Sequence, residues 1–252
     1  MADDVLRADV PVVLRAGGGE GRLWGALLDV AAAQPSGWTL VGGLMVMLHA
    51  LEVGLATGRV TNDVDAVAES RGVAQATHLL SSTLVSLGWS LDARDFTGEE
   101  TGFTFRRDGL RFDVLAAEGL GPRADITTLP PAQSVPVAGG TRALQRSQRV
   151  AVRLGDRGGV VPRPDVLGAL VIKSAAAALD RGRSSDPTRR PERHAEDLAV
   201  LYTAVADPVA LRAELTGGDL RRLRAAPEPT WEVVRSAASR AAGIAAYAVI
   251  VA

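Results

Sequence analysis

The chain of 252 residues contains no cysteine, has one lysine (Lys173) among its 28 basic residues, and is poor in aromatic side chains. Without cysteine it forms neither a disulfide bond nor a thiolate-ligated metal site. The net charge of −1 also shows no excess of either sign, so any surface that binds nucleic acid must be a local one.

The sequence also lacks a long apolar run. The longest apolar stretch near the C-terminus, residues 241–252, is well short of the roughly 20 residues that a membrane-spanning helix needs. The first ten residues, MADDVLRADV, do not show the basic-then-apolar order of a secretory signal. We therefore expect a cytoplasmic protein with no membrane partner.

Hydrophobic residues make up 47% of the chain, which is enough for a substantial core. Their spacing predicts helices at 20–33, 44–56, 73–87 and 166–179, and strands at 38–41, 63–68, 89–91, 102–106 and 110–115. The last two strands are expected to form a hairpin through Asp108-Gly109, a good turn sequence.

The order of these elements predicts an α+β protein. Residues 1–160 would form a mixed sheet with flanking helices, and residues 161–252 would form a helical C-terminal domain. The segment 119–164, which is rich in glycine and proline, is expected to complete the sheet.

Two aspartates in the predicted strand 63–68 suggest a metal site. Successive side chains of a strand point to opposite faces, so Asp63 and Asp65 share one face while Val64 and Ala66 point to the core. Two carboxylates this close repel each other unless a cation lies between them, and their oxygens suit Mg²⁺. The alternative is a pair of solvated carboxylates on a surface strand.

A pair of glycines, Gly42-Gly43, opens the apolar helix that precedes these aspartates. A glycine turn leading into a helix presents free backbone N–H groups, which suit a phosphate. We expect this turn to let the backbone approach a phosphate group.

A third carboxylate, Asp113, stands between apolar residues in the strand 110–115. Such an aspartate is unfavourable inside a core unless it has a partner. It is either part of the same site or an edge-strand residue that faces water.

Lys173 lies at the centre of the apolar helix 166–179, for which Asp165 is a candidate N-cap. A buried ammonium should point to an anion. The alternative is that Lys173 has no special role and is a lysine kept by chance in an arginine-rich sequence.

Asp197 is expected to begin the next helix. Between the two helices lies the densest group of basic residues, namely Arg181, Arg183, Arg189, Arg190 and Arg193.

Two motifs in this order resemble a known family. Gly42-Gly43 followed by R-x-T-x-D-x-D resembles the polymerase-β-like nucleotidyltransferase superfamily, and more narrowly the AbiEii/MenT-type nucleotidyltransferases of toxin–antitoxin systems. The second motif of that family is similar to the residues Lys173, Arg181, Arg193-His194, Asp197 and Leu201.

The resemblance implies a nucleotidyltransferase fold and a set of roles. The implied catalytic residues are Asp63, Asp65, Asp113, Lys173 and Asp197, of which the first three would hold Mg²⁺ or Mn²⁺. The implied substrate-binding residues are Gly42, Gly43, Arg59, Thr61, Arg181, Arg189, Arg190, Arg193 and His194.

The activity implied is transfer of a nucleoside monophosphate from an NTP to the 3′ end of a tRNA, by a growth-arresting toxin with a cognate antitoxin. One alternative is an adenylyltransferase that modifies an aminoglycoside-like small molecule. Another is a non-catalytic protein of this fold that acts as a binding partner or antitoxin, which would be indicated if Asp113 and Lys173 lay far from Asp63.

Overall fold

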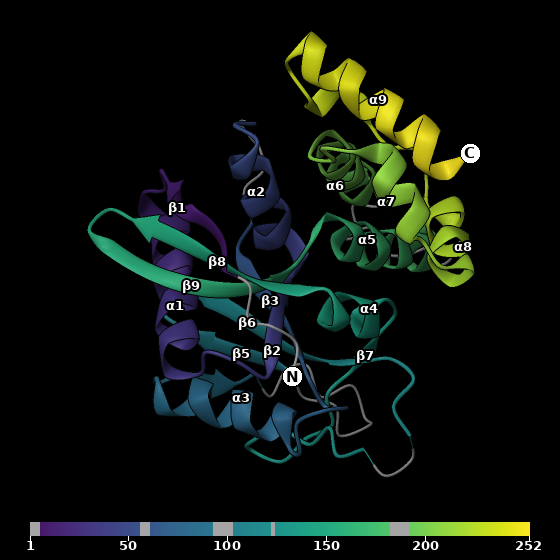
Figure 1. The fold of residues 1–252 in the computed structure, drawn as a ribbon. Coiled ribbons are helices and arrows are strands. Elements are labelled where there is room, and N and C mark those ends of the chain that lie inside the picture. The colour runs from purple at the N-terminus through teal and green to yellow at the C-terminus, as the bar shows by residue number, and fades with distance from the viewer. Residues whose placement is uncertain (1–5, 56–60, 93–102, 122–123, 182–191) are drawn as a thin grey trace.

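The computed structural model describes residues 6–55, 61–92, 103–121, 124–181 and 192–252 (Figure 1). The side chains of residues 6–10 and of Arg181 are also outside this description.

The larger sheet of the described chain is mixed and carries the D-x-D sequence near its middle. Its strand order is β2-β3-β6-β5-β4, and β7 pairs with the end of β6 in parallel. Strand β3 runs antiparallel to β2 and parallel to β6, while β5 runs antiparallel to β6. These strands are β2 (Trp38–Val41), β3 (Asp63–Ala68), β4 (Ser90–Leu91), β5 (Thr104–Arg107), β6 (Leu110–Ala117) and β7 (Pro136–Val137).

A second sheet has the order β1-β8-β9 and was not anticipated from the sequence. Its strands are β1 (Leu6–Leu14), β8 (Ser147–Leu154) and β9 (Arg157–Pro164). The expectation that 119–164 completes the main sheet is therefore correct for β7 alone. The long β8–β9 hairpin pairs with the N-terminal strand instead, and β9 packs across β2.

Helices accompany the sheets and then make up the described C-terminal part (Figure 1). Those that alternate with strands are α1 (Gly18–Ala33), α2 (Gly42–Glu52), α3 (Ala76–Ser86) and α4 (Gly140–Gln145). The C-terminal ones are α5 (Val166–Arg181), α6 (Glu192–Thr203), α7 (Pro208–Glu214), α8 (Gly217–Ala225) and α9 (Ala237–Val251), with a 3-10 turn η2 (Trp231–Val233). The α+β class, with a mixed sheet and a helical C-terminal part, is thus confirmed.

The apolar helix α2 joins the two parts. It packs on β3 and also contacts α5 and α6 (Figure 1). Its buried residues, such as Leu44 and Leu48, belong to the same continuous core as Leu198 and Leu201 of α6. This shared core holds the C-terminal helices against α2 and the sheet.

Local sequence signals account for several boundaries. Asp108 and Gly109 have φ values of 52° and 78° and close the β5–β6 hairpin, as the D-G turn predicts. Asp165 accepts a hydrogen bond from the Gly168 N–H (2.9 Å), so it caps α5 as expected. The helix containing Asp197 begins five residues earlier than expected, at Glu192, which places Asp197 in its buried interior.

Among the described residues no helix is long and apolar enough to cross a membrane.

Candidate active site

The three predicted carboxylates meet on two neighbouring strands. Asp65 of β3 stands directly opposite Asp113 of β6, and Asp63 lies two residues before Asp65 on the same face. Val64 and Ala66 are completely buried on the other face, as the alternation predicts. The parallel pairing of β3 with β6 is what brings a residue 48 positions away beside the D-x-D sequence.

Gly42, at the start of α2, lies against the Asp65 carboxylate. Its φ is +68°, and a Cβ added there would lie 1.8 Å from Oδ2 of Asp65. Glycine is therefore required for two reasons, because other residues disfavour this backbone conformation and because Asp65 occupies the space that a side chain would need. The close approach holds the Asp65 carboxylate at the N-terminal end of the helix.

Replacing Gly42 with alanine is expected to destabilise the protein by roughly 2–5 kcal/mol, the sum of a left-handed backbone penalty and an overpacking penalty. Gly54 is the matched control. It has a φ of +70°, and no described atom lies within 4 Å of the Cβ that it would gain. Gly54→Ala should lose only roughly 1–2 kcal/mol in urea unfolding. Equal losses in the two variants would show that Asp65 does not fill the space beside Gly42.

Hydrogen-bond donors fix two of the carboxylates. Arg111 donates from Nε to Oδ1 of Asp113 (2.8 Å) and from Nη2 to Oδ2 (2.7 Å), and Thr104 donates to Oδ1 (2.8 Å). Thr61 donates to Oδ1 of Asp63 (2.6 Å). Thr61, a predicted substrate-binding residue, is thus engaged with a predicted metal ligand.

The positive charges near the cluster do not fully offset the burial and mutual repulsion of its carboxylates. Burial, followed by the charges of Asp63 and Asp113, raises the pKa of Asp65 to about 7, and Lys173 and Arg111 oppose this shift. Burial also raises the pKa of Asp113, although Arg111 and Thr104 counteract it. A cation placed among these groups would relieve their repulsion.

Lys173 reaches the site from the helical part. It lies on α5, only 5% exposed, and its Nζ donates to Oδ2 of Asp197 on α6 (2.7 Å), which is 1% exposed. Its charge acts on Asp65 as well, since it lowers the pKa of that carboxyl group. Lys173 therefore interacts both with Asp197 of the second motif and with Asp65 of the first.

The predicted basic residues are less fully described. Arg193 is exposed at the start of α6, and His194 lies with Nε2 3.0 Å from Oδ2 of Asp180. Arg59, Arg183, Arg189 and Arg190, together with the side chain of Arg181, lie outside the described residues.

The carboxylates present fit a hard divalent cation in their chemistry. Asp63 and Asp65 supply the oxygen donors that Mg²⁺ and Mn²⁺ prefer, in a site that is short of positive charge. Within the described part of the chain, however, no three His, Cys, Asp or Glu side chains are grouped to hold a metal ion. Asp113 could contribute only after Arg111 releases at least one of its oxygens.

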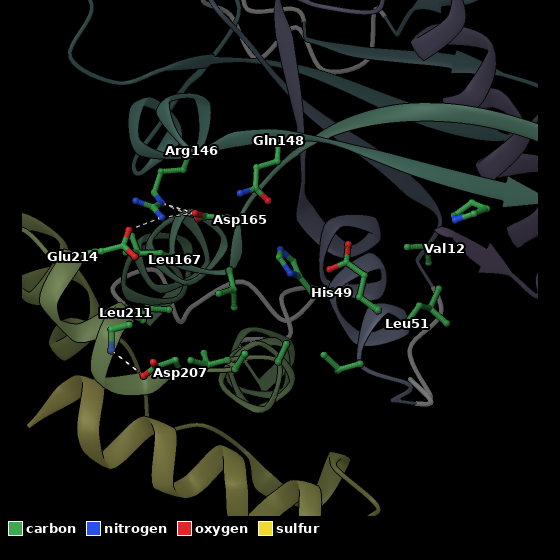
Figure 2. Close-up of a pocket in the computed structure, with 18 of the residues that line it drawn as sticks. Val12, His49, Leu51, Arg146, Gln148, Asp165, Leu167, Asp207, Leu211 and Glu214 are labelled. Carbon is green, nitrogen blue, oxygen red and sulfur yellow. Dashed lines mark hydrogen bonds and ion pairs between the residues drawn. The ribbon is translucent and has the colours of Figure 1, made fainter. Parts of the chain in front are cut away.

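A cavity of about 800 Å³ lies elsewhere, between β1, the end of α2 and the helices α5 and α7 (Figure 2). Arg146 binds Asp165 and Glu214 across it, and Gln148 also lines it. Its described lining includes none of the residues predicted to be functional. The predicted functional residues therefore indicate the aspartate cluster as the candidate active site, and this cavity is a separate feature.

Sequence reasoning missed Arg111 and Thr104. Both lie on the aspartate face of the sheet, since Thr104 is opposite Asp113 and Arg111 precedes it by two residues. The alternation of β6 would have placed Arg111 beside Asp113, but only the structure shows that the two side chains bind each other.

No family model and no curated protein matches the sequence. The fold is similar to the solution structure of the antibiotic-resistance factor ANT(2'')-Ia, with a TM-score of 0.42 and 16% sequence identity, over 73% of this chain and 83% of that chain. At this level of similarity, the function has to be argued from the residues of the site.

Proposed function

We propose that this protein is a metal-dependent nucleotidyltransferase that moves a nucleoside monophosphate from an NTP to an acceptor hydroxyl. The observation that carries the proposal is the convergence on Asp65 of Asp113 from β6 and of the charge of Lys173 from α5. The alternative of a non-catalytic protein predicts that these residues lie apart. Their convergence supports the catalytic alternative.

Asp63 and Asp65 would hold Mg²⁺ or Mn²⁺, and Asp113 would complete the set. When bound, such a cation neutralises charge on the triphosphate and makes the α-phosphorus easier to attack.

The transfer itself balances as a displacement at phosphorus. A bond forms between the acceptor oxygen and the α-phosphorus, the bond to the β-phosphate oxygen breaks, and pyrophosphate leaves. The proton of the acceptor hydroxyl would pass to Asp113, which stands beside the proposed metal ligands. Lys173 would neutralise negative charge on the phosphates, and Asp197 would hold its ammonium in place.

The acceptor that we propose is the 3′ end of a tRNA, which would make the protein a growth-arresting toxin with an antitoxin partner. The support is the match of Lys173, His194 and Asp197 to the second motif of AbiEii/MenT-type enzymes, together with Arg193 exposed beside it. A small polycationic acceptor would be repelled by the arginine-rich segment 181–193.

The test is incubation of the purified protein with each radiolabelled NTP, Mg²⁺ or Mn²⁺, and either total tRNA or an aminoglycoside antibiotic. We expect label on tRNA with one NTP, no label in EDTA, and none with Asp63→Ala. Label on the antibiotic alone would reassign the acceptor to a small molecule. Absence of transfer to either acceptor, with nucleotide and metal binding also absent, would contradict the proposed activity.

A further inference from the structure

The guanidinium of Arg111 occupies the position that a cation would take beside Asp113. The two residues are two apart on β6 and share a face, and the two hydrogen bonds form a fork on both carboxylate oxygens. The Asp113 side chain is 7% exposed, whereas that of Arg111 is 36% exposed. The carboxylate is thus fixed in the site, and the arginine has solvent into which it can turn.

Few acceptor positions of the Asp113 carboxylate remain for another ligand while Arg111 binds both of its oxygens. A carboxylate has about four lone-pair positions on its two oxygens. Oδ1 already accepts from Arg111 and from Thr104, and Oδ2 accepts from Arg111. A divalent cation on Oδ2 would also lie next to a guanidinium, and the two positive charges would repel each other.

Arg111 also faces the other two aspartates. Its backbone stands opposite Asp63 across the β3–β6 pair, and its charge lowers the pKa of Asp65. It is therefore placed to balance the negative charge of the whole cluster. A cation bound among the three carboxylates would balance that charge instead, and would weaken the attraction that holds the guanidinium there.

We infer that Arg111 is the resident counter-ion of Asp113, that a divalent cation displaces it, and that the released guanidinium then binds the phosphates of the nucleotide. This inference rests on the proposed function. It makes Arg111 a nucleotide-binding residue that couples the two ligands, because binding of the metal frees the guanidinium that the phosphates need.

The inference predicts opposite effects on the two ligands when Arg111 is neutralised. In Arg111→Gln, Mn²⁺ alone should bind roughly tenfold or more tightly, since a neighbouring arginine changes the affinity of an aspartate for a proton by a similar factor. A non-hydrolysable NTP analogue with Mn²⁺ should bind roughly tenfold more weakly, the scale of one charge-assisted hydrogen bond. A purely structural role would weaken both.

The experiment measures Mn²⁺ binding to the full chain by calorimetry, then analogue binding at saturating Mn²⁺. Arg106→Gln is the matched control, because Arg106 stands opposite Arg111 on β5 and is 40% exposed, but pairs with Asp92. It should leave both affinities unchanged. If Arg111→Gln does not fold, Arg111→Lys should show the same two changes at smaller size, because a lysine cannot form the fork.

Unchanged or weaker Mn²⁺ binding in a folded Arg111 variant would overturn the inference while leaving the proposed function intact, provided that the wild type transfers label. Opposite shifts in a protein that transfers no label would support the inference and count against the proposed reaction. If neither wild type nor variant binds Mn²⁺, both are contradicted.

Discussion

Replacing Asp65 with asparagine is expected to abolish nucleotidyl transfer and to stabilise the metal-free protein at pH 8. The activity should fall because Asp65 stands at the centre of the cluster, between Asp63 and Asp113, and an amide cannot replace a charged metal ligand. The stability should rise because the substitution removes a carboxylate that burial and two neighbouring charges disfavour.

The sign of the pH dependence follows from the pKa of Asp65. This pKa is about 7 in the folded protein, against 3.8 for an ordinary aspartate. Between these values the folded state holds a proton that the unfolded state has lost, so the contribution of Asp65 to stability falls as pH rises from about 4 to about 7. The slope is at most roughly 1.4 kcal/mol per pH unit, and above pH 7 the contribution stays at its least favourable value.

Urea unfolding of the wild type and Asp65→Asn at pH 5, 6, 7 and 8, without metal, measures this difference. The advantage of the variant should grow with pH and then level off. Asp108→Asn serves as the control, because Asp108 has a side chain that is 84% exposed in a turn outside the cluster. A stability difference between wild type and Asp65→Asn that does not change with pH would contradict the proposed electrostatics.

Replacing Lys173 with methionine is expected to cost both stability and activity, for separable reasons. The substitution leaves the buried Asp197 without the ammonium that binds it at 2.7 Å. Breaking a buried ion pair from one side typically costs roughly 3–5 kcal/mol. The double variant Lys173→Met/Asp197→Leu should recover most of that loss, since an apolar pair can replace a buried ion pair at little cost.

Activity should not return with stability in the double variant. If Lys173 neutralises phosphate charge, transfer should remain reduced by roughly 10²–10³-fold, the usual effect of losing one electrostatic contact in an active site. Arg142→Met is the matched control, since it removes a cation 3.0 Å from another buried carboxylate, Asp219. It should lose stability while keeping activity per folded molecule. A double variant with wild-type activity would leave Lys173 with a structural role alone.

Local sequence determined much of the secondary structure of the site. The alternation of Asp63, Val64, Asp65 and Ala66 predicted which side chains face the core, and the burial of Val64 and Ala66 agrees. The Asp108-Gly109 turn and the Asp165 cap were also predictable. In each case the cause lies within a few residues, in backbone conformation or in one side-chain hydrogen bond, so a short stretch of sequence contains all the information needed.

Only the tertiary structure decided which distant groups meet. The opposition of Asp65 and Asp113 depends on the register of two strands, and the pairing of Lys173 with Asp197 depends on how α5 packs on α6. The fork of Arg111 on Asp113 is a choice of side-chain conformation that the strand alternation permits but does not require. Strand register and helix packing are set by the whole core and not by local sequence, because many residues must be buried at once for one arrangement to be favoured. For this reason the sequence suggested the aspartates and Lys173 as candidates, and the fold determined which groups balance their charges.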